Sequence, residues 1–225
     1  MSPDPKTAGP PPTPEGYDDH DPFEHSTVLL LVLSVPIGIL AFAGFGWILW
    51  GVQSPEVFFR GVGVTETAEA ITVALDLVAV LVSFVVALAV VVVVHELIHG
   101  AVMRQYGKDV TYGVHLAMGA FYTAAFGQFQ AVEELVPIAI APLLLIALVG
   151  TPLLFVPVPI VALTVYLILA SNAAGAVGDL YVVRRLRRLP DGTLLYDADL
   201  HHWCVFEPAT RSEKGGPDQF ESVGA

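Results

Sequence analysis

Four long apolar segments dominate the pattern of hydrophobic and polar positions along the chain. They cover approximately residues 27–50, 70–104, 135–155 and 160–183. Each has about 20 residues or more, and a helix of that length crosses the hydrocarbon core of a bilayer. The pattern therefore predicts four transmembrane helices.

Shorter segments with a different pattern lie outside these runs. Residues 110–116 alternate between apolar and polar or small side chains, and residues 121–123 are rich in β-forming side chains. They predict a short hairpin between the second and third helices, on the cytoplasmic side or dipping into the membrane. A Pro-Asp-Gly turn at 190–192 precedes residues 193–206, which predict one or two short strands. The expected fold class is an all-α polytopic membrane protein with a hairpin between helices two and three and a short C-terminal β segment.

The two ends of the chain differ in composition from the segment between them. Residues 1–25 are acidic and rich in proline, with few large aliphatic side chains, which predicts a disordered tail. We therefore divide the chain into this tail, a membrane domain at 26–189, and a C-terminal part at 190–225. The C-terminal part is expected to hold the short cytoplasmic β segment and a second disordered tail.

Composition supports a membrane protein and limits its partners. The chain has 225 residues, of which 55% are hydrophobic, and its net charge is −12 with only ten lysines and arginines. Such an acidic chain is unsuited to bind nucleic acid or anionic lipid as its main partner. Its acidic, lysine-poor composition resembles that of proteins from salt-loving archaea. The single cysteine, Cys204, excludes an internal disulfide and a cysteine-based zinc site.

Basic residues predict the orientation in the membrane. Six lie close to the end of the second or the fourth apolar segment, and one lies between the first and second segments: Arg104, Lys108, Arg184, Arg185, Arg187 and Arg188 against Arg60. Because cytoplasmic loops carry the excess of lysine and arginine, both termini are expected in the cytoplasm, in a multi-pass protein of the cell membrane.

The sequence His-Glu-Leu-Ile-His at 95–99 closes the second apolar segment. His95 and His99 are four residues apart, so both imidazoles lie on one face of a helix and can bind one metal ion. In this motif the glutamate between the histidines, here Glu96, acts as a general base on the metal-bound water. Ionisable groups at membrane depth are costly and usually functional, although a chance polar cluster at a helix end is the plainer alternative.

A hydrolytic zinc site needs a third protein ligand and one open position. The extended metzincin motif would place a histidine at 105, where this chain has Gln105. Glu133 or Glu134, just before the third helix, is one candidate. Asp179 is preferred, because it lies near the cytoplasmic end of the fourth helix, at the depth expected for both histidines.

Several other polar or small residues are weaker candidates. Asn172 lies two turns before Asp179 on nearly the same helical stripe and, with His115 of the hairpin, is a candidate for substrate positioning. A strand histidine held by hydrogen bonds is the alternative for His115. Small residues in the fourth segment, Ala170, Ala174 and Gly178, suit the close approach of the second helix. A second metal site at His201, His202 and Cys204 competes with a solvated strand, whose adjacent side chains point to opposite faces.

These motifs carry a family resemblance over about residues 70–200. The chain resembles the putative zincin peptidases, small membrane proteins classed as a domain of unknown function, in His-Glu-Leu-Ile-His-Gly at 95–100 and Asn-x-x-Gly-x-x-Gly-Asp at 172–179. It is more distantly similar to the site-2 protease group, although the Asn-Pro-x-x-x-Leu-Asp-Gly setting of that group is missing. The resemblance implies a zinc ion and peptidase activity.

The resulting hypothesis is a zinc-dependent, membrane-embedded peptidase that acts on membrane-protein or peptide substrates. His95, His99 and Asp179 would bind Zn²⁺, Glu96 would be the general base, and the hairpin would hold an extended substrate segment. Two alternatives remain open at this point: a membrane scaffold that binds metal without catalysis, and a zinc hydrolase of a lipid amide or ester.

Overall fold

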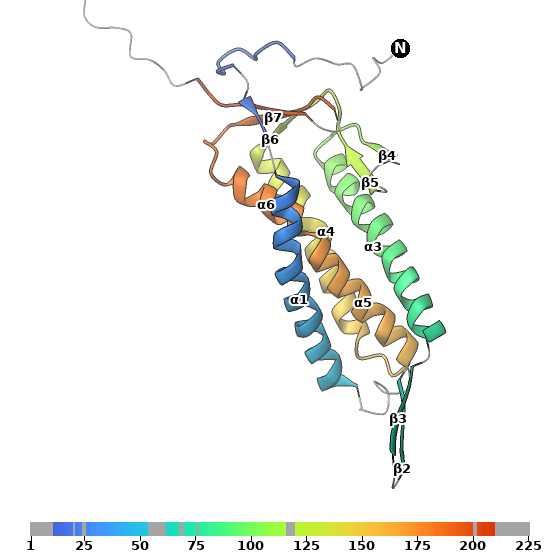
Figure 1. The fold of residues 1–225 in the computed structure, drawn as a ribbon. Helices are drawn as coiled ribbons and strands as arrows, with labels where there is room; N and C mark the ends of the chain where they lie inside the picture. Colours follow the sequence, from blue (N-terminus) through green and yellow to red (C-terminus); the bar gives the residue numbers. More distant parts are fainter. Residues whose placement is uncertain are drawn as a thin grey trace, which may run out of the picture.

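The computed structural model of the protein describes residues 11–19, 21–23, 26–53, 62–67, 70–75, 77–115, 120–199 and 202–209. The helices are α1 (Thr27–Val52), α3 (Leu77–Gln105), α4 (Val132–Leu153), α5 (Pro159–Gly175) and α6 (Val177–Leu186) (Figure 1). The strands are β1 (Asp21–Pro22), β2 (Val62–Thr67), β3 (Ala70–Leu75), β4 (Thr111–His115), β5 (Ala120–Ala124), β6 (Phe129–Ala131), β7 (Leu194–Asp197) and β8 (Trp203–Phe206). Arg60, His201 and the outer parts of both expected tails lie outside the described residues.

Four helical segments in the described part of the chain are long and apolar enough to cross a membrane. They are Val28–Val52, Val80–Gln105, Val132–Leu153 and Pro159–Leu186. Their outer faces expose large apolar side chains such as Leu31, Leu81 and Leu148, as lipid-facing helices do. The four apolar segments predicted from the sequence are therefore confirmed as helices of membrane-spanning length.

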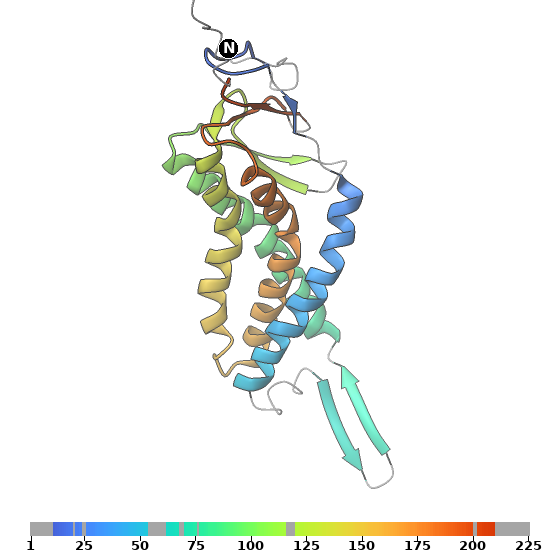
Figure 2. The same ribbon diagram turned by 90° about the vertical axis from the view of Figure 1, so that its left-hand side faces the viewer.

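The prediction for the start of the second helix is wrong. Residues 70–75 were expected to be helical, but they form β3, which pairs antiparallel with β2 in the register Val64↔Val73 and Thr65↔Thr72. The β-branched side chains of this segment favour an extended backbone, and helix α3 begins only at Leu77. The β2–β3 hairpin extends beyond the helices at one end of the molecule (Figures 1 and 2).

The fourth apolar segment is interrupted. Helix α5 ends at Gly175 and α6 begins at Val177, with Ala176 (φ −71°, ψ 6°) between them. A single helix over 160–183 was expected, so that prediction is wrong at this position. The glycines on either side of the break lower helix propensity where it occurs. The break places Asp179 in the first turn of α6 rather than near the end of one long helix.

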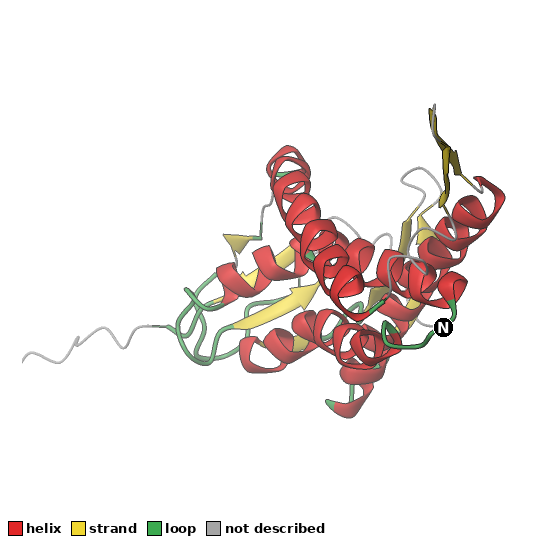
Figure 3. Cartoon of the chain, turned by 90° about the horizontal axis from the view of Figure 1, so that it is seen from below, coloured by secondary structure: helices red, strands yellow, loops and turns green. Residues whose placement is uncertain are grey.

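Helix α5 packs against α1, α3 and α4. Viewed from the end that carries β2 and β3, the helices form one bundle (Figure 3). Ala174 faces Gly38 of α1, where a Cβ added to the glycine would lie 3.5 Å from that of Ala174. Helix α1 is therefore a close neighbour at Ala174, and α5 also packs against α3, the second helix that we expected beside this segment.

A four-stranded antiparallel sheet in the order β1-β8-β7-β6 covers the opposite end of the bundle (Figure 2). Strands β7 and β8 confirm the predicted C-terminal strands, whereas β1 and β6 were not predicted. A hydrophobic cluster joins the sheet to the helices, and it includes Phe23, Met103, Leu135, Leu186 and Val205. The sheet is thereby fixed to the helix ends that carry the polar residues of interest.

The predicted hairpin between the second and third helices is present as β4 and β5, with Tyr112 opposite Thr123 and Gly113 opposite Tyr122. It packs along the last part of α3 (Figure 1). Its depth relative to a membrane stays a prediction.

Candidate metal centre

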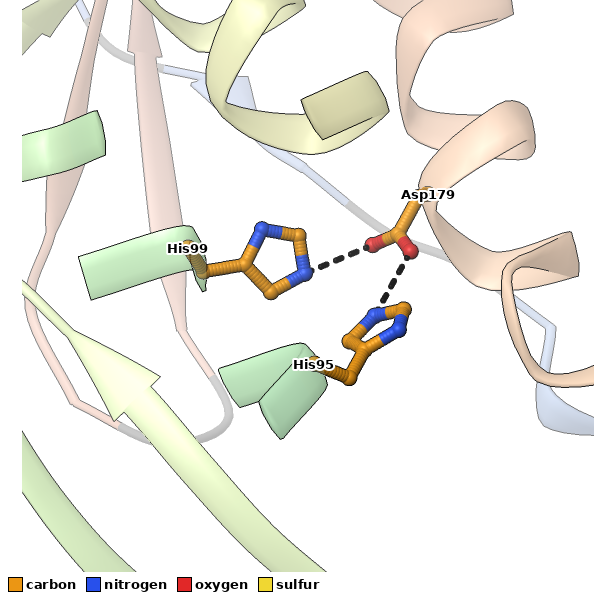
Figure 4. A group of neighbouring side chains, drawn as sticks. All are labelled: His95, His99 and Asp179. Carbon is orange, nitrogen blue, oxygen red and sulfur yellow. Dashed lines mark hydrogen bonds and ion pairs between the residues drawn. The ribbon is translucent and has the colours of Figure 1, made fainter. Parts of the chain in front are cut away.

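Three potential metal ligands converge where α3 meets α6. His95 and His99 lie one turn apart on α3, with their ring centroids 4.8 Å apart, and Asp179 faces both from α6 (Figure 4). His95 Nε2 is 3.1 Å from Asp179 Oδ2, and His99 Nε2 is 3.4 Å from Asp179 Oδ1. One ligand atom from each residue lies within 4.8 Å of the others. The structure thus brings together the three residues that the sequence singled out.

The other ring nitrogen of each histidine has its own partner. His95 Nδ1 is 2.9 Å from Asn172 Oδ1, and His99 Nδ1 is 2.9 Å from the backbone oxygen of Ile138. The Asn172 amide nitrogen faces the carbonyl oxygen of Pro142 at 3.4 Å, which can only accept a hydrogen bond. Asn172 therefore turns its oxygen to His95, so both Nδ1 atoms face acceptors.

Pro142 explains why the Ile138 carbonyl is free for His99. In a helix this oxygen would accept a hydrogen bond from the amide of residue 142, and proline has no N–H. A neighbouring polar side chain can satisfy the carbonyl that a proline frees inside a transmembrane helix. His99, which is only 9% exposed, has this role. Neither Ile138 nor Pro142 was recognised from the sequence as part of the site. The sequence does show that Pro142 frees the carbonyl four residues earlier. It does not show which side chain binds that carbonyl.

These contacts determine which nitrogen faces the aspartate. An Nδ1 that donates to an oxygen carries the hydrogen, so a neutral ring has only a lone pair at Nε2. The Asp179 carboxylate also offers only lone pairs. Acceptor atoms 3.1 and 3.4 Å apart require a proton or a cation between them. The arrangement therefore suits a metal ion.

The donor set fits zinc. Two imidazole nitrogens and one carboxylate oxygen are a usual catalytic zinc set, and ligands about 2.1 Å from a tetrahedral ion are about 3.4 Å from one another. The two Nε2-to-carboxylate distances are close to that spacing. Hydrogen bonds from the outer ring nitrogens to protein oxygens are also typical of zinc-binding histidines.

Glu96 lies beside this cluster. It lines the same pocket as His99 and Asp179. Its backbone oxygen accepts a hydrogen bond of 2.8 Å from the hydroxyl of Thr123, which ties β5 to the motif helix.

Gly100 allows the hairpin to approach α3 at the end of the motif. A Cβ at this position would overlap the hydroxyl group of Tyr112, so only glycine leaves space for that ring. Arg104, one turn later, lies over the same ring at 5.2 Å from its centroid. The glycine that follows His99 therefore positions the hairpin next to the candidate metal centre.

The alternative third ligands make other contacts. Glu134 pairs with Lys108 at 2.6 Å and accepts a hydrogen bond from the Ala131 amide. The carboxylate of Glu133 accepts from the Gly192 amide at 3.4 Å. Within the described ranges, no further group of three candidate ligands occurs.

Among the remaining candidates, His202 and Cys204 make contacts of their own in or beside the sheet. His202 pairs with Asp199, and Cys204 is buried in the sheet. His115 belongs to β4, and its use in substrate positioning stays a prediction.

One comparison with known proteins is informative. The family model described as putative zincin peptidase matches residues 88–194, a segment that holds both histidines, Glu96 and Asp179. The match confirms the family resemblance recognised in the sequence, while the similarity to site-2 proteases stays a prediction. No curated protein and no solved structure matches the chain.

Proposed function

We propose that this protein is a zinc-dependent peptidase that acts within or at a membrane. The observation that supports it best is the convergence of His95, His99 and Asp179, with the outer nitrogen of each histidine held by a protein oxygen. The family match over residues 88–194 points to the same class of enzyme.

His95 Nε2, His99 Nε2 and the Asp179 carboxylate would hold the zinc ion. In a site with three protein ligands and an open fourth position, zinc lowers the pKa of water to about 7 and polarises a carbonyl group. Asn172 acts through His95 by fixing the orientation of its ring.

Glu96 would move the proton. Its carboxylate accepts a proton from the water that attacks the peptide carbonyl carbon, and it then donates that proton to the leaving nitrogen as the C–N bond breaks. The products are a carboxylic acid and an amine, which together contain every atom of the peptide bond and the water, so the reaction balances without a further reactant.

The substrate would be extended where it is cut. The amides of a transmembrane helix are tied up in internal hydrogen bonds, so a membrane-protein substrate must unwind locally or present an extended segment. The β4–β5 hairpin lies next to the motif helix and would offer a strand edge to such a segment, as in β-augmentation.

The site would face the cytoplasm in a protein of the cell membrane. This orientation rests on the basic residues near the ends of α3 and α6, because cytoplasmic loops carry the excess of lysine and arginine. A cysteine placed just after Arg188 in a Cys204→Ser background should react with a membrane-impermeant maleimide only after the cells are opened. Labelling of intact cells would contradict the orientation and leave the metal centre unaffected.

Substitution of Glu96 separates an enzyme from a metal-binding scaffold. Glu96→Gln keeps the size of the side chain but cannot accept the proton. It should bind about one zinc ion per chain, with cleavage of membrane-protein and peptide substrates reduced by about 10²-fold or more. His99→Ala should lose zinc and cleavage together. Glu133→Gln is the matched control, because the same change is made at an exposed glutamate outside the cluster.

Zinc content and cleavage are measured together for all four proteins. Undiminished cleavage by zinc-loaded Glu96→Gln would exclude Glu96 as the base. Zinc binding that persists in His99→Ala would exclude the ligand set.

A further inference from the structure

A pocket of about 270 Å³ opens beside the three candidate ligands. Glu96, His99 and Asp179 contribute to its wall. One part of the remaining wall comes from β5, with Phe121, Tyr122 and Thr123. The rest is apolar and comes from Met103, Leu135, Ile138, Ala139, Val182 and Trp203. Apart from Glu96, His99 and Asp179, no residue in the wall carries a carboxylate, imidazole, ammonium or guanidinium group.

The apolar part of the pocket leads away from the ligands toward the sheet. Met103 lies four residues after His99 on α3, and Val182 lies three residues after Asp179 on α6, so each is one turn further along its helix. Trp203 belongs to β8, in the sheet that covers these helix ends. A group bound in the pocket would therefore have one end at Glu96 and its bulk among apolar side chains.

We propose that this pocket binds one bulky apolar side chain of the substrate, from a residue next to the bond that is cut. The inference rests on the proposed peptidase function and adds a substrate class to it. Pockets for whole drug-sized ligands start at about 300 Å³, so this one has room for a single large side chain such as that of Phe, Leu or Met. Acidic side chains are disfavoured by Glu96 and Asp179, and away from these two carboxylates the wall is mostly apolar, so it favours an apolar side chain.

Two residues that line the pocket lie on different helices and can be changed to test it. Ala139 on α4 is 7% exposed and follows Ile138, whose carbonyl binds His99. Ala139→Leu adds three carbon atoms to the wall and narrows the pocket. Val182→Ala on α6 removes two carbon atoms and widens it. Neither residue is a candidate metal ligand.

The test uses binding rather than turnover. Zinc-loaded protein in detergent is titrated with three zinc-binding hydroxamates that differ only in a benzyl, isobutyl or methyl side chain. For the wild type, the benzyl and isobutyl compounds should bind at least about ten-fold more tightly than the methyl compound, the scale on which apolar pockets distinguish side chains. In Ala139→Leu this preference should fall at least about three-fold, while Val182→Ala should keep it or increase it for the benzyl compound.

Ala101→Leu is the matched control, because it makes the same change on an exposed face of α3. It should leave the preference unchanged. Affinity for the methyl compound reports an intact metal centre in every variant, so a misfolded protein cannot imitate a narrowed pocket.

The outcomes separate the two proposals. Equal affinity of the wild type for all three compounds would overturn the pocket and leave the metal centre standing. An unchanged preference in Ala139→Leu would also overturn it, because the side chain would then bind elsewhere. If protein that holds zinc binds none of the compounds, the metal has no open position, and the proposed function fails together with this inference.

Discussion

Asn172 offers a sensitive test of how the candidate zinc ligands are oriented. It is 1% exposed, and its oxygen accepts the hydrogen bond from His95 Nδ1. Asn172→Leu keeps the approximate volume of the side chain and removes both hydrogen bonds that the amide makes. His95 then has a poorly solvated N–H without a partner, and its ring loses the contact that directs Nε2 to Asp179.

The size of the effect follows from that hydrogen bond. Loss of the outer partner of a zinc-binding histidine weakens metal affinity about 10- to 100-fold, or about 1.4 to 2.7 kcal/mol. The cost of a buried donor without a partner is similar, at about 1 to 3 kcal/mol. We therefore expect the zinc dissociation constant of Asn172→Leu to rise by one to two orders of magnitude.

The assay is competition with a chromophoric zinc chelator, and Asn172→Asp is the control. A carboxylate also accepts the hydrogen bond from His95, so the aspartate variant should stay within a few-fold of the wild type. The dissociation constant of Asn172→Leu could instead equal that of the wild type, with an unchanged unfolding midpoint for the metal-free protein. Asn172 would then not orient His95, and the reasoning about the ring nitrogens would be refuted.

Three further changes test other parts of the structure. Pro142→Ala supplies an amide that competes with His99 for the freed carbonyl, so zinc affinity should fall by a few-fold in the same chelator assay, and a rise would contradict that competition. Alanine favours a helix over glycine by about 1 kcal/mol, but the Cβ of Gly100→Ala would overlap the ring of Tyr112, so the unfolding midpoint should fall. A higher midpoint would show that the Tyr112 ring moves freely. Burial, reinforced by a neighbouring acid, raises the pKa of Asp197 to about 7, so the folded state keeps a proton that the unfolded state loses near pH 4. The free energy of unfolding, measured by chemical denaturation, should therefore fall as pH rises from about 4 to 7. In Asp197→Asn this decline should largely disappear.

The parts of the site that depend on local geometry could be predicted from the sequence. Spacing of four residues fixes His95 and His99 on one helical face whatever surrounds the helix. Asp179 was found because the ends of two membrane-spanning helices must lie at similar depth. Membrane-spanning length likewise gave four apolar helices, since it depends only on a run of apolar residues.

Features that depend on distant partners could not be predicted. The proline at 142 was visible in the sequence, but only the packed structure shows that His99 is the donor that reaches the freed carbonyl. Strands β1 and β6 are two and three residues long, and they gain their partners from the C-terminal strands. The apolar run from residue 70 looked like a helix because hydrophobicity alone does not distinguish a buried helix from a strand.

Other differences arise from short-range competition. At Ala176 the fourth apolar segment loses its regular helix between two glycines, although the segment Pro159–Leu186 as a whole is long and apolar enough to cross a membrane. An apolar run identifies a segment that can cross a membrane but does not say whether its backbone stays regular throughout. This break decides where Asp179 lies in its helix.

The most direct test of the candidate metal centre is X-ray absorption at the zinc edge of protein loaded with one zinc ion per chain. The spectrum should show two imidazole nitrogens and carboxylate or water oxygens at about 2.0 to 2.2 Å, and His99→Ala should lose one imidazole or the metal itself. A sulfur ligand at about 2.3 Å could come only from Cys204, the single cysteine, which is buried in the sheet. That result, or a spectrum with one imidazole or none in the wild type, would contradict a zinc centre built from His95, His99 and Asp179.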